Sequence, residues 1–243
     1  MILRLRPTYR NLSFVFLASF PAGPLQANCY FIAAEPGADC AIVDPGMDSF
    51  DGIQAAVAEH RLNPVAVLVT HGHFDHMWQA AEVAEKFGAT VWIHPEDEHL
   101  LTQPLQAISS ESASAMRAQF GFDQDVELPA PSSVKAAVPG AIINVGSLSI
   151  TVDHVPGHTA GSVIYRSAYD GNEDISQVMF TGDFVFAGAI GRTDLVGGSD
   201  AQMRESLKWF LTQDDDIALF PGHGPQSTVA REKVSNPFLL ELM

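Results

Sequence analysis

The stretch Thr70-His71-Gly72-His73-Phe74-Asp75-His76 carries three histidines and one aspartate within seven residues. It directly follows Val65-Ala66-Val67-Leu68-Val69, a run that is apolar at every position, as a strand covered on both faces must be. In α/β folds, ligands bind beyond the carboxyl ends of strands. The stretch is therefore the first candidate for a functional site, and the run before it predicts a sheet between layers of other structure.

The spacing within this stretch indicates metal binding. His71 and His73 are two residues apart on extended backbone, so both imidazoles project to the same side and can hold one ion. Asp75 and His76 lie at the turn into a helix, where they can face a second position, and Gly72 keeps side-chain bulk out of the loop. Two metal ions about 3.5–4 Å apart form a recognised hydrolytic centre. The alternative is that Asp75 only caps the helix and the histidines are exposed.

Three later stretches each place one histidine or aspartate after a strand and a glycine. They are Val155-Pro156-Gly157-His158-Thr159, Phe180-Thr181-Gly182-Asp183 and Phe220-Pro221-Gly222-His223-Gly224. One such stretch alone is more often structural than ligating, but three together with the first motif indicate a shared centre. The carboxylate of Asp183 offers two oxygens and can contact two divalent ions at once.

The rest of the pattern predicts two α/β halves, because strands and helices alternate along the chain. The first half is expected to hold strands at 40–43, 65–69 and 90–93 and helices at 50–60 and 79–87. The second half is expected to hold strands at 142–144, 148–155, 162–166, 178–181 and 217–220, a helix at 201–211 and a terminal helix. Residues 96–121 are interpreted as a helical insertion, and residues 129–140, rich in Pro, Ser and Ala, as an irregular boundary.

The N-terminal residues 1–27 allow two interpretations. Three arginines precede an apolar run at 12–20, a pattern that also occurs in signal peptides. The run ends at Pro21, and residues 26–32 read as a second strand, so two paired strands explain the same residues. We favour the strands. No apolar stretch reaches the roughly eighteen residues needed to cross a bilayer, and we expect a cytoplasmic protein.

Composition narrows the class of partner. The chain has 243 residues, of which 47% are hydrophobic and 17% charged, so a globular protein is expected, with one domain over residues 1–243. With 29 acidic against 13 basic residues, the formal net charge is −16. Such a surface repels nucleic acids and anionic membranes, which leaves a small molecule as the expected partner. The two cysteines, Cys29 and Cys40, match no zinc-binding spacing.

Together these motifs resemble the metallo-β-lactamase superfamily, on its glyoxalase II-like branch. The resemblance runs from residue 26 to residue 239, and the block His71–His76 is its most specific part. The run Gly191-Arg192-Thr193-Asp194-Leu195, with Pro221-Gly222-His223-Gly224-Pro225, is similar to small bacterial glyoxalase II-like hydrolases and, less closely, to persulfide dioxygenases. The resemblance implies an α/β fold, a four-layer αββα sandwich, with metals at one edge of two facing sheets.

The resemblance also implies residue roles. The first metal would be bound by His71, His73 and His158, the second by Asp75, His76 and His223, and Asp183 would bridge them. Asp75 and Asp183 are the expected catalytic carboxylates. Arg192 is expected to contact a substrate carboxylate, the alternative being an ion pair with Asp194. Asp44 is expected either to orient the histidine loop or only to cap a turn. Zinc is the expected metal, one or two ions per chain, with iron or manganese as alternatives because the same ligands accommodate all three.

The activity that follows is hydrolysis by a metal-bound hydroxide, since a bound divalent ion lowers the pKa of water to about 7. A thiolate leaves unaided, whereas an amine must be protonated, so the expected substrate is a small acyl thioester such as an acylglutathione. Hydrolysis of a lactone is the next most expected activity. The alternative enzyme is a non-haem iron persulfide dioxygenase that uses His71, His158 and Asp183, and a non-catalytic metal-binding module is a third possibility.

Overall fold

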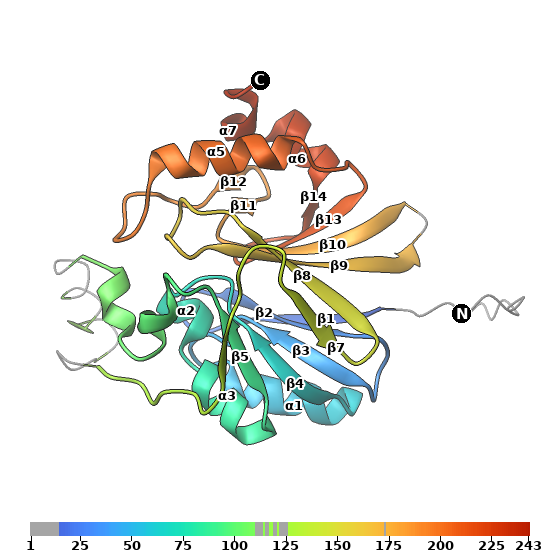
Figure 1. Cartoon of the computed structure of the whole chain (residues 1–243), viewed down its shortest axis with the longest axis vertical. Helices are drawn as coiled ribbons and strands as arrows, with labels where there is room; N and C mark the ends of the chain where they lie inside the picture. Colours follow the sequence, from blue (N-terminus) through green and yellow to red (C-terminus); the bar gives the residue numbers. More distant parts are fainter. Residues whose placement is uncertain (1–14, 110–113, 115–116, 119–120, 122–125, 173) are drawn as a thin grey trace, which may run out of the picture.

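Two six-stranded sheets face each other, and helices cover their outer faces (Figure 1). This holds for residues 15–109, 114, 117, 118, 121, 126–172 and 174–243, which the computed structural model describes. The arrangement confirms the expected four-layer αββα sandwich. Among the described residues, no helix has the length and apolar character that a membrane span requires.

The first sheet has the order β1-β2-β3-β4-β5-β6. Its strands are β1 (Phe16–Ala22), β2 (Ala27–Ala33), β3 (Asp39–Val43), β4 (Asn63–Leu68), β5 (Thr90–Ile93) and β6 (Val134–Ala136). The first three pair antiparallel, which agrees with the paired strands expected near the N-terminus, although residues 1–14 lie outside the described part. From β3 to β6 the strands are parallel, with α1 (Phe50–His60) and α3 (Ala80–Phe87) as connections.

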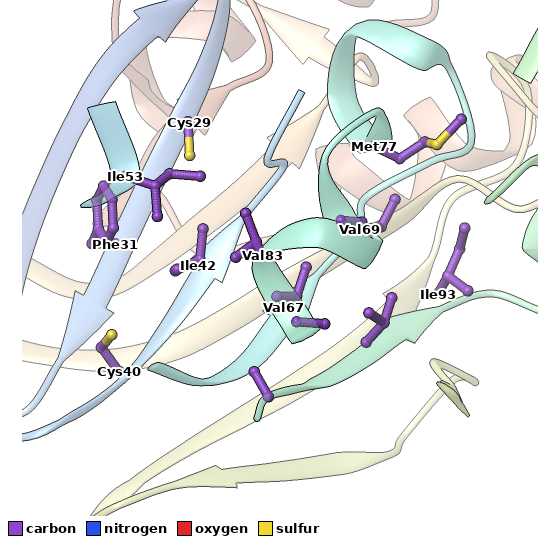
Figure 2. Packing of buried hydrophobic residues seen from close by; sticks show 14 of the residues in the cluster. Cys29, Phe31, Cys40, Ile42, Ile53, Val67, Val69, Met77, Val83 and Ile93 are labelled. Atoms are coloured by element: carbon purple, nitrogen blue, oxygen red, sulfur yellow. The ribbon is translucent and has the colours of Figure 1, made fainter. Parts of the chain in front are cut away.

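The apolar run before the first histidines forms β4 because both faces of this strand are covered. Val67 and Val69 pack against the helical layer, in the cluster that contains Ile53 and Val83 (Figure 2). Leu68 lies in the cluster between the two sheets. This alternation follows from the two-residue period of a strand. Because both sides of β4 are fixed by packing, the residues that follow it leave the sheet at a defined point.

The second sheet has the order β14-β13-β10-β9-β8-β7. Its strands are β7 (Ile142–Val145), β8 (Leu148–His154), β9 (Val163–Asn172), β10 (Ile175–Gly182), β13 (Ile217–Pro221) and β14 (Ser227–Thr228). The outer face packs against α5 (Asp200–Leu211), which buries Met203, Leu207 and Phe210 against the sheet. The helix begins at the Ser199 cap, whose hydroxyl accepts a hydrogen bond from the Gln202 N–H at 3.3 Å. The helices α6 (Val229–Ser235) and α7 (Pro237–Leu240) follow at the C-terminus.

The structure agrees in part with one of the expected segments and corrects another. The expected helical insertion at 96–121 begins with two short 3₁₀ helices, η1 (Glu98–Leu101) and η2 (Pro104–Ala107); residues 114, 117 and 118 are α-helical, and most of 110–125 lies outside the described residues. The expected irregular boundary at 129–140 contains the edge strand β6. The short helix α2 (Phe74–Met77) and the hairpin of β11 (Val185–Phe186) and β12 (Ala189–Ile190) are also new. The strands β6, β11 and β12 have only two or three residues and α2 is a single helical turn, which is too little of a period to be found from the pattern.

Candidate metal centre

All seven expected ligands lie beyond the carboxyl ends of strands, at one edge of the two sheets. His71 and His73 follow β4, and Asp75 and His76 lie on α2. Three more side chains come from the second sheet, where β8, β10 and β13 are followed by His158, Asp183 and His223. The potential ligand atoms of the seven side chains lie within 4.8 Å of one another in two separate groups of three, and in a third group, His71, His76 and Asp183, that overlaps both. The structure therefore brings residues from both sheets into one cage.

The first group consists of His71, His73 and His158, all of them buried. The Nε2 atom of His71 lies 3.2 Å from Nδ1 of His73, and the ring centroids of His73 and His158 are 4.5 Å apart. Burial, followed by the neighbouring imidazole of His158, lowers the pKa of His73 to about 3. Burial also lowers the pKa of His71. The rings of His71 and His73 are therefore neutral near pH 7, which is the form that binds a metal.

The second group consists of Asp75, His76 and His223. The Nε2 atom of His223 lies 3.2 Å from Oδ2 of Asp75 and 3.3 Å from Nε2 of His76. Burial acts to lower the pKa of His76, but the carboxylates of Asp183, Asp75 and Asp44 outweigh it and raise the value to about 10. The carboxylates thus favour the protonated, positively charged form of the His76 ring.

Asp183 lies between the two groups. Its Oδ1 atom is 3.3 Å from His76 Nε2, and its Oδ2 atom is 3.6 Å from Nε2 of His158 and 3.6 Å from Nε2 of His223. The side chain can approach this closely because residue 222 is glycine. A Cβ atom there would collide with Asp183 Oδ1 and would lie 2.6 Å from His76 Cε1. One carboxylate therefore faces histidines of both groups.

The residues of the cage fit divalent cations. The Nε2 atoms of His73 and His158 are buried, yet neither has a hydrogen-bond partner among the described residues. Buried polar atoms are rarely left without a partner unless a ligand or an ion supplies one. Imidazole nitrogens with carboxylate oxygens are donors that zinc, iron and manganese accept. An ion bound by the first group would give these two buried nitrogens the partner that they lack.

Contacts outside the cage orient its histidines. Asp44, in the left-handed region with φ of 51°, accepts hydrogen bonds from the Thr70 N–H at 2.8 Å and from Nδ1 of His76 at 2.9 Å. The geometry thus agrees with the orienting role expected for Asp44. Nδ1 of His158 donates to the main-chain carbonyl of Arg192 at 2.7 Å. Both contacts turn the Nε2 atom of the histidine toward the cage.

The side chain of Arg192 is paired with Asp194. Its Nε and terminal nitrogen lie 2.7 and 2.6 Å from the two carboxylate oxygens of Asp194, and both side chains are mostly exposed. This ion pair was the alternative to substrate binding. The substrate contact of Arg192 stays a prediction.

Sequence reasoning missed two residues of β2 that support the site. The hydroxyl of Tyr30 donates to the Pro221 carbonyl at 2.7 Å, and the Asn28 side chain donates to the carbonyls of Pro221 and Gly224 at 3.0 and 2.9 Å. These bonds join the first sheet to the turn that carries His223. Sequence reasoning also missed Asp97, a buried carboxylate outside the cage. Its position just past β5, the neighbour of β4 in the sheet, was the available signal.

The sandwich and the cage at its edge place this protein in the class of metallo-beta-lactamase folds. The sequence profile of the metallo-beta-lactamase superfamily matches residues 22–223, and the chain belongs to this superfamily. Members of the superfamily are generally metal-dependent hydrolases.

Curated relatives share most of their length with this chain. An uncharacterized protein of Mycobacterium tuberculosis is 40% identical over 93% of this chain and 98% of its own. The probable metallo-hydrolase YqgX of Bacillus subtilis is 33% identical, over 90% of this chain and 95% of its own. The hydroxyacylglutathione hydrolase GloC of Haemophilus influenzae is 32% identical, also over 90% and 95%.

Solved structures show the same architecture. The B3 metallo-beta-lactamase BLEG-1 has a TM-score of 0.75 and 29% identity, over 92% of this chain and 99% of its own. The protein TTHA1623, solved in a di-iron-bound form, has a TM-score of 0.70 and 32% identity, over 91% of this chain and 100% of its own.

Proposed function

We propose that the protein hydrolyses small acyl thioesters, such as an acylglutathione, with divalent cations held by the cage. The observation that carries this proposal is the pair of three-residue groups joined by Asp183. The similarity to GloC, described as a hydroxyacylglutathione hydrolase, supports the substrate class and the glyoxalase II-like branch of the superfamily. Zinc is the first candidate, and the di-iron form of TTHA1623 supports iron as the second.

Each group would hold one ion. His71, His73 and His158 would bind the first, Asp75, His76 and His223 the second, and Asp183 would contact both. Bound divalent ions supply hydroxide at neutral pH by lowering the pKa of water to about 7, and they polarise a substrate carbonyl. Burial acts to raise the pKa of Asp75, but His76 and the hydrogen bond from His223 outweigh it and lower the value. Asp75 is thus ionised and can accept a hydrogen bond from the attacking water.

The leaving group favours a thioester. A thiolate departs without protonation, so the chain need not supply a general acid to the leaving sulfur. Asp183 and Asp75 would keep the attacking water oriented while the imidazoles hold their positions through Asp44 and the Arg192 carbonyl. An amide would need a proton donor in addition to these groups.

Arg192 would recognise an anionic part of the substrate. Its guanidinium is exposed, and its main chain is fixed by the hydrogen bond to His158, which forms part of the cage. It also lines a cavity of about 430 Å³, together with Met203, Leu207 and Phe238. This volume lies within the range of small-molecule sites. A carboxylate on the thiol carrier would replace Asp194 as the bidentate partner of Arg192.

The test is thiol release from lactoylglutathione and from a neutral acyl thioester by zinc-loaded and iron-loaded protein. We expect metal-dependent hydrolysis that His158→Ala abolishes and that His99→Ala, at an exposed histidine that is not one of the seven cage residues, leaves intact. Thiol release at the buffer rate with both metals would contradict the proposal. The same preparations are given glutathione persulfide in an oxygen electrode. Oxygen uptake by the iron form, without thioester hydrolysis, would replace the hydrolase with the dioxygenase.

A further inference from the structure

Asp97 lies outside the cage, in the turn after β5. We propose that Asp97 is a positioning residue, which fixes the loop of His71 and His73 relative to the loop of His158 and thereby sets the affinity of the first metal group. The inference rests on the proposed metal site, but not on the thioester substrate.

The carboxylate of Asp97 binds both loops at once. Its Oδ2 atom accepts hydrogen bonds from the Gly72 N–H at 2.8 Å and from the Thr159 hydroxyl at 2.7 Å. Its Oδ1 atom accepts a hydrogen bond from the Gly161 N–H at 2.9 Å. Gly72 stands between His71 and His73, and Thr159 directly follows His158. Three donors from the two ligand loops therefore converge on one side chain.

The two loops need such a link because they come from different sheets. His71 and His73 follow β4 of the first sheet, whereas His158 follows β8 of the second. A main-chain hydrogen bond from Val163 to the carbonyl of Thr70, at 2.8 Å, already joins the sheets at the base of the loops. Asp97 adds the connection next to the imidazoles. The three rings of the first group must meet on one ion, so their positions depend on this second link.

Two glycines allow the turn of Asp97 to lie close to both ligand loops. A Cβ atom on Gly161 would lie 2.5 Å from Asp97 Cγ, so a larger residue there would push the carboxylate away. A Cβ atom on Gly72 would lie 2.8 Å from the Cβ atom of Leu100, which is in the same turn as Asp97. Asp97 itself is held by its N–H, which donates to the His94 carbonyl at 3.0 Å. Asp97 as a whole is 2% exposed, so its contacts are shielded from water.

The ionised carboxylate is the form that fits these contacts, because all three partners are donors. In Asp97→Asn one oxygen becomes an NH₂ group, which cannot accept a hydrogen bond and faces at least one N–H or O–H donor. The shape of the side chain is kept while the link between the loops is weakened. Supporting contacts of this kind change metal affinity about 10- to 100-fold.

The experiment is a zinc titration of the full chain against a competing chelator, for wild type, Asp97→Asn and Glu98→Gln. Glu98 is the exposed neighbour, and its variant makes the same change in charge. We expect Asp97→Asn to weaken one of the two zinc sites about 10- to 100-fold, to leave the other unchanged, and to alter the visible spectrum of the cobalt-loaded protein. Glu98→Gln is expected to match wild type in the affinities of both zinc sites and in the cobalt spectrum.

Two results would contradict the proposed role of Asp97. Wild-type affinities and an unchanged cobalt spectrum in Asp97→Asn, whether or not its melting temperature falls, would show that Asp97 only stabilises the fold. If this variant does not fold, Thr159→Val removes one donor to Asp97 and keeps both main-chain contacts. It should then weaken the same site by a smaller factor, and unchanged affinity in it would overturn the proposal. Because no substrate is used, zinc binding without thioester hydrolysis would contradict the proposed function and leave the role of Asp97 intact.

Discussion

Single contacts decide which nitrogen each histidine turns toward the cage. Asp44 accepts a hydrogen bond from Nδ1 of His76, and the carbonyl of Arg192 accepts one from Nδ1 of His158. The Thr70 hydroxyl lies 3.1 Å from Nδ1 of His71. A hydrogen bond at one ring nitrogen sets the tautomer and the direction of the other. The inward direction of Nε2 in these histidines is thus a property of residues that would touch no metal.

The two groups should differ in the protons that they release when they bind zinc. Asp183 and the other carboxylates raise the pKa of His76, so its ring holds a proton at pH 7, whereas the rings of His71 and His73 are already neutral. Zinc must displace the proton of His76, so binding at the second group should weaken as the pH falls. Calorimetry at pH 7 in buffers of different ionisation enthalpy should show proton release with one of two ions. Equal release for both ions would refute this.

Replacing Arg192 separates its side chain from its main chain. In Arg192→Ala the carbonyl that holds His158 remains, so we expect kcat to be kept while KM for an anionic thioester rises about tenfold. KM for a neutral thioester should not change. Arg231→Ala, which removes an exposed arginine from α6, is the matched control. An unchanged KM for the anionic substrate would show that the guanidinium serves only its pair with Asp194.

Gly222→Ala should damage the cage and little else. The added methyl group would collide with Asp183 and press on His76, so we expect zinc stoichiometry or affinity to fall at the second group. Gly224→Ala lies in the same turn, where a Cβ atom meets nothing within 4 Å, and its φ of 75° costs about 1 kcal/mol in stability. Chelator competition on both variants measures the difference. Full zinc affinity in Gly222→Ala would contradict the described packing.

At the scale of elements, the C-terminal helices hold the hairpin that follows Asp183. Glu232 of α6 is fully buried, and its carboxylate accepts hydrogen bonds from the Gly188 N–H at 2.8 Å, from Nδ2 of Asn236 at 3.0 Å and from the Ser227 hydroxyl. Asn236 also donates to the Ala189 carbonyl at 3.0 Å. The hairpin β11–β12 is thereby tied to α6 and α7.

Glu232→Gln should lower the free energy of unfolding by about 2–4 kcal/mol, because its NH₂ group would face donors that the carboxylate now accepts. Urea denaturation of the metal-free protein measures this change. Glu205→Gln removes only an exposed pair with Lys208 and should stay within about 0.5 kcal/mol of wild type. A Glu232→Gln variant as stable as wild type would mean that the buried carboxylate does not hold the hairpin.

Elements with a clear apolar pattern could be predicted from the sequence, including strands of four residues, whereas strands of two or three residues could not. The run 65–69 shows burial on both faces, and the strand β4 has the packing that this predicts. The helices at 50–60 and 201–211 also lie where periodicity placed them. The strand β6 has three residues among prolines and serines, and the pairing with β5 that defines it joins residues about forty positions apart. Local pattern carries no information about such a contact.

At the scale of the whole molecule, the cage depends on the two sheets facing each other. The motifs could predict which histidines and aspartates converge, because each lies shortly after a strand, and the structure brings all seven together. They could not predict what holds the loops. Asn28, Tyr30 and Asp97 bond to residues between 25 and 196 positions away in the sequence, and only the finished fold shows their partners. Their roles depend on distance in space rather than on spacing in the chain.

The central claim is that the seven side chains hold divalent cations, and anomalous X-ray diffraction from zinc-loaded crystals tests it most directly. We expect two anomalous peaks, one among His71, His73 and His158 and one among Asp75, His76 and His223, with Asp183 between them. With a net charge of −16, the surface offers other acidic sites for stray ions. Peaks confined to the surface, with the cage empty at full zinc loading, would contradict the account.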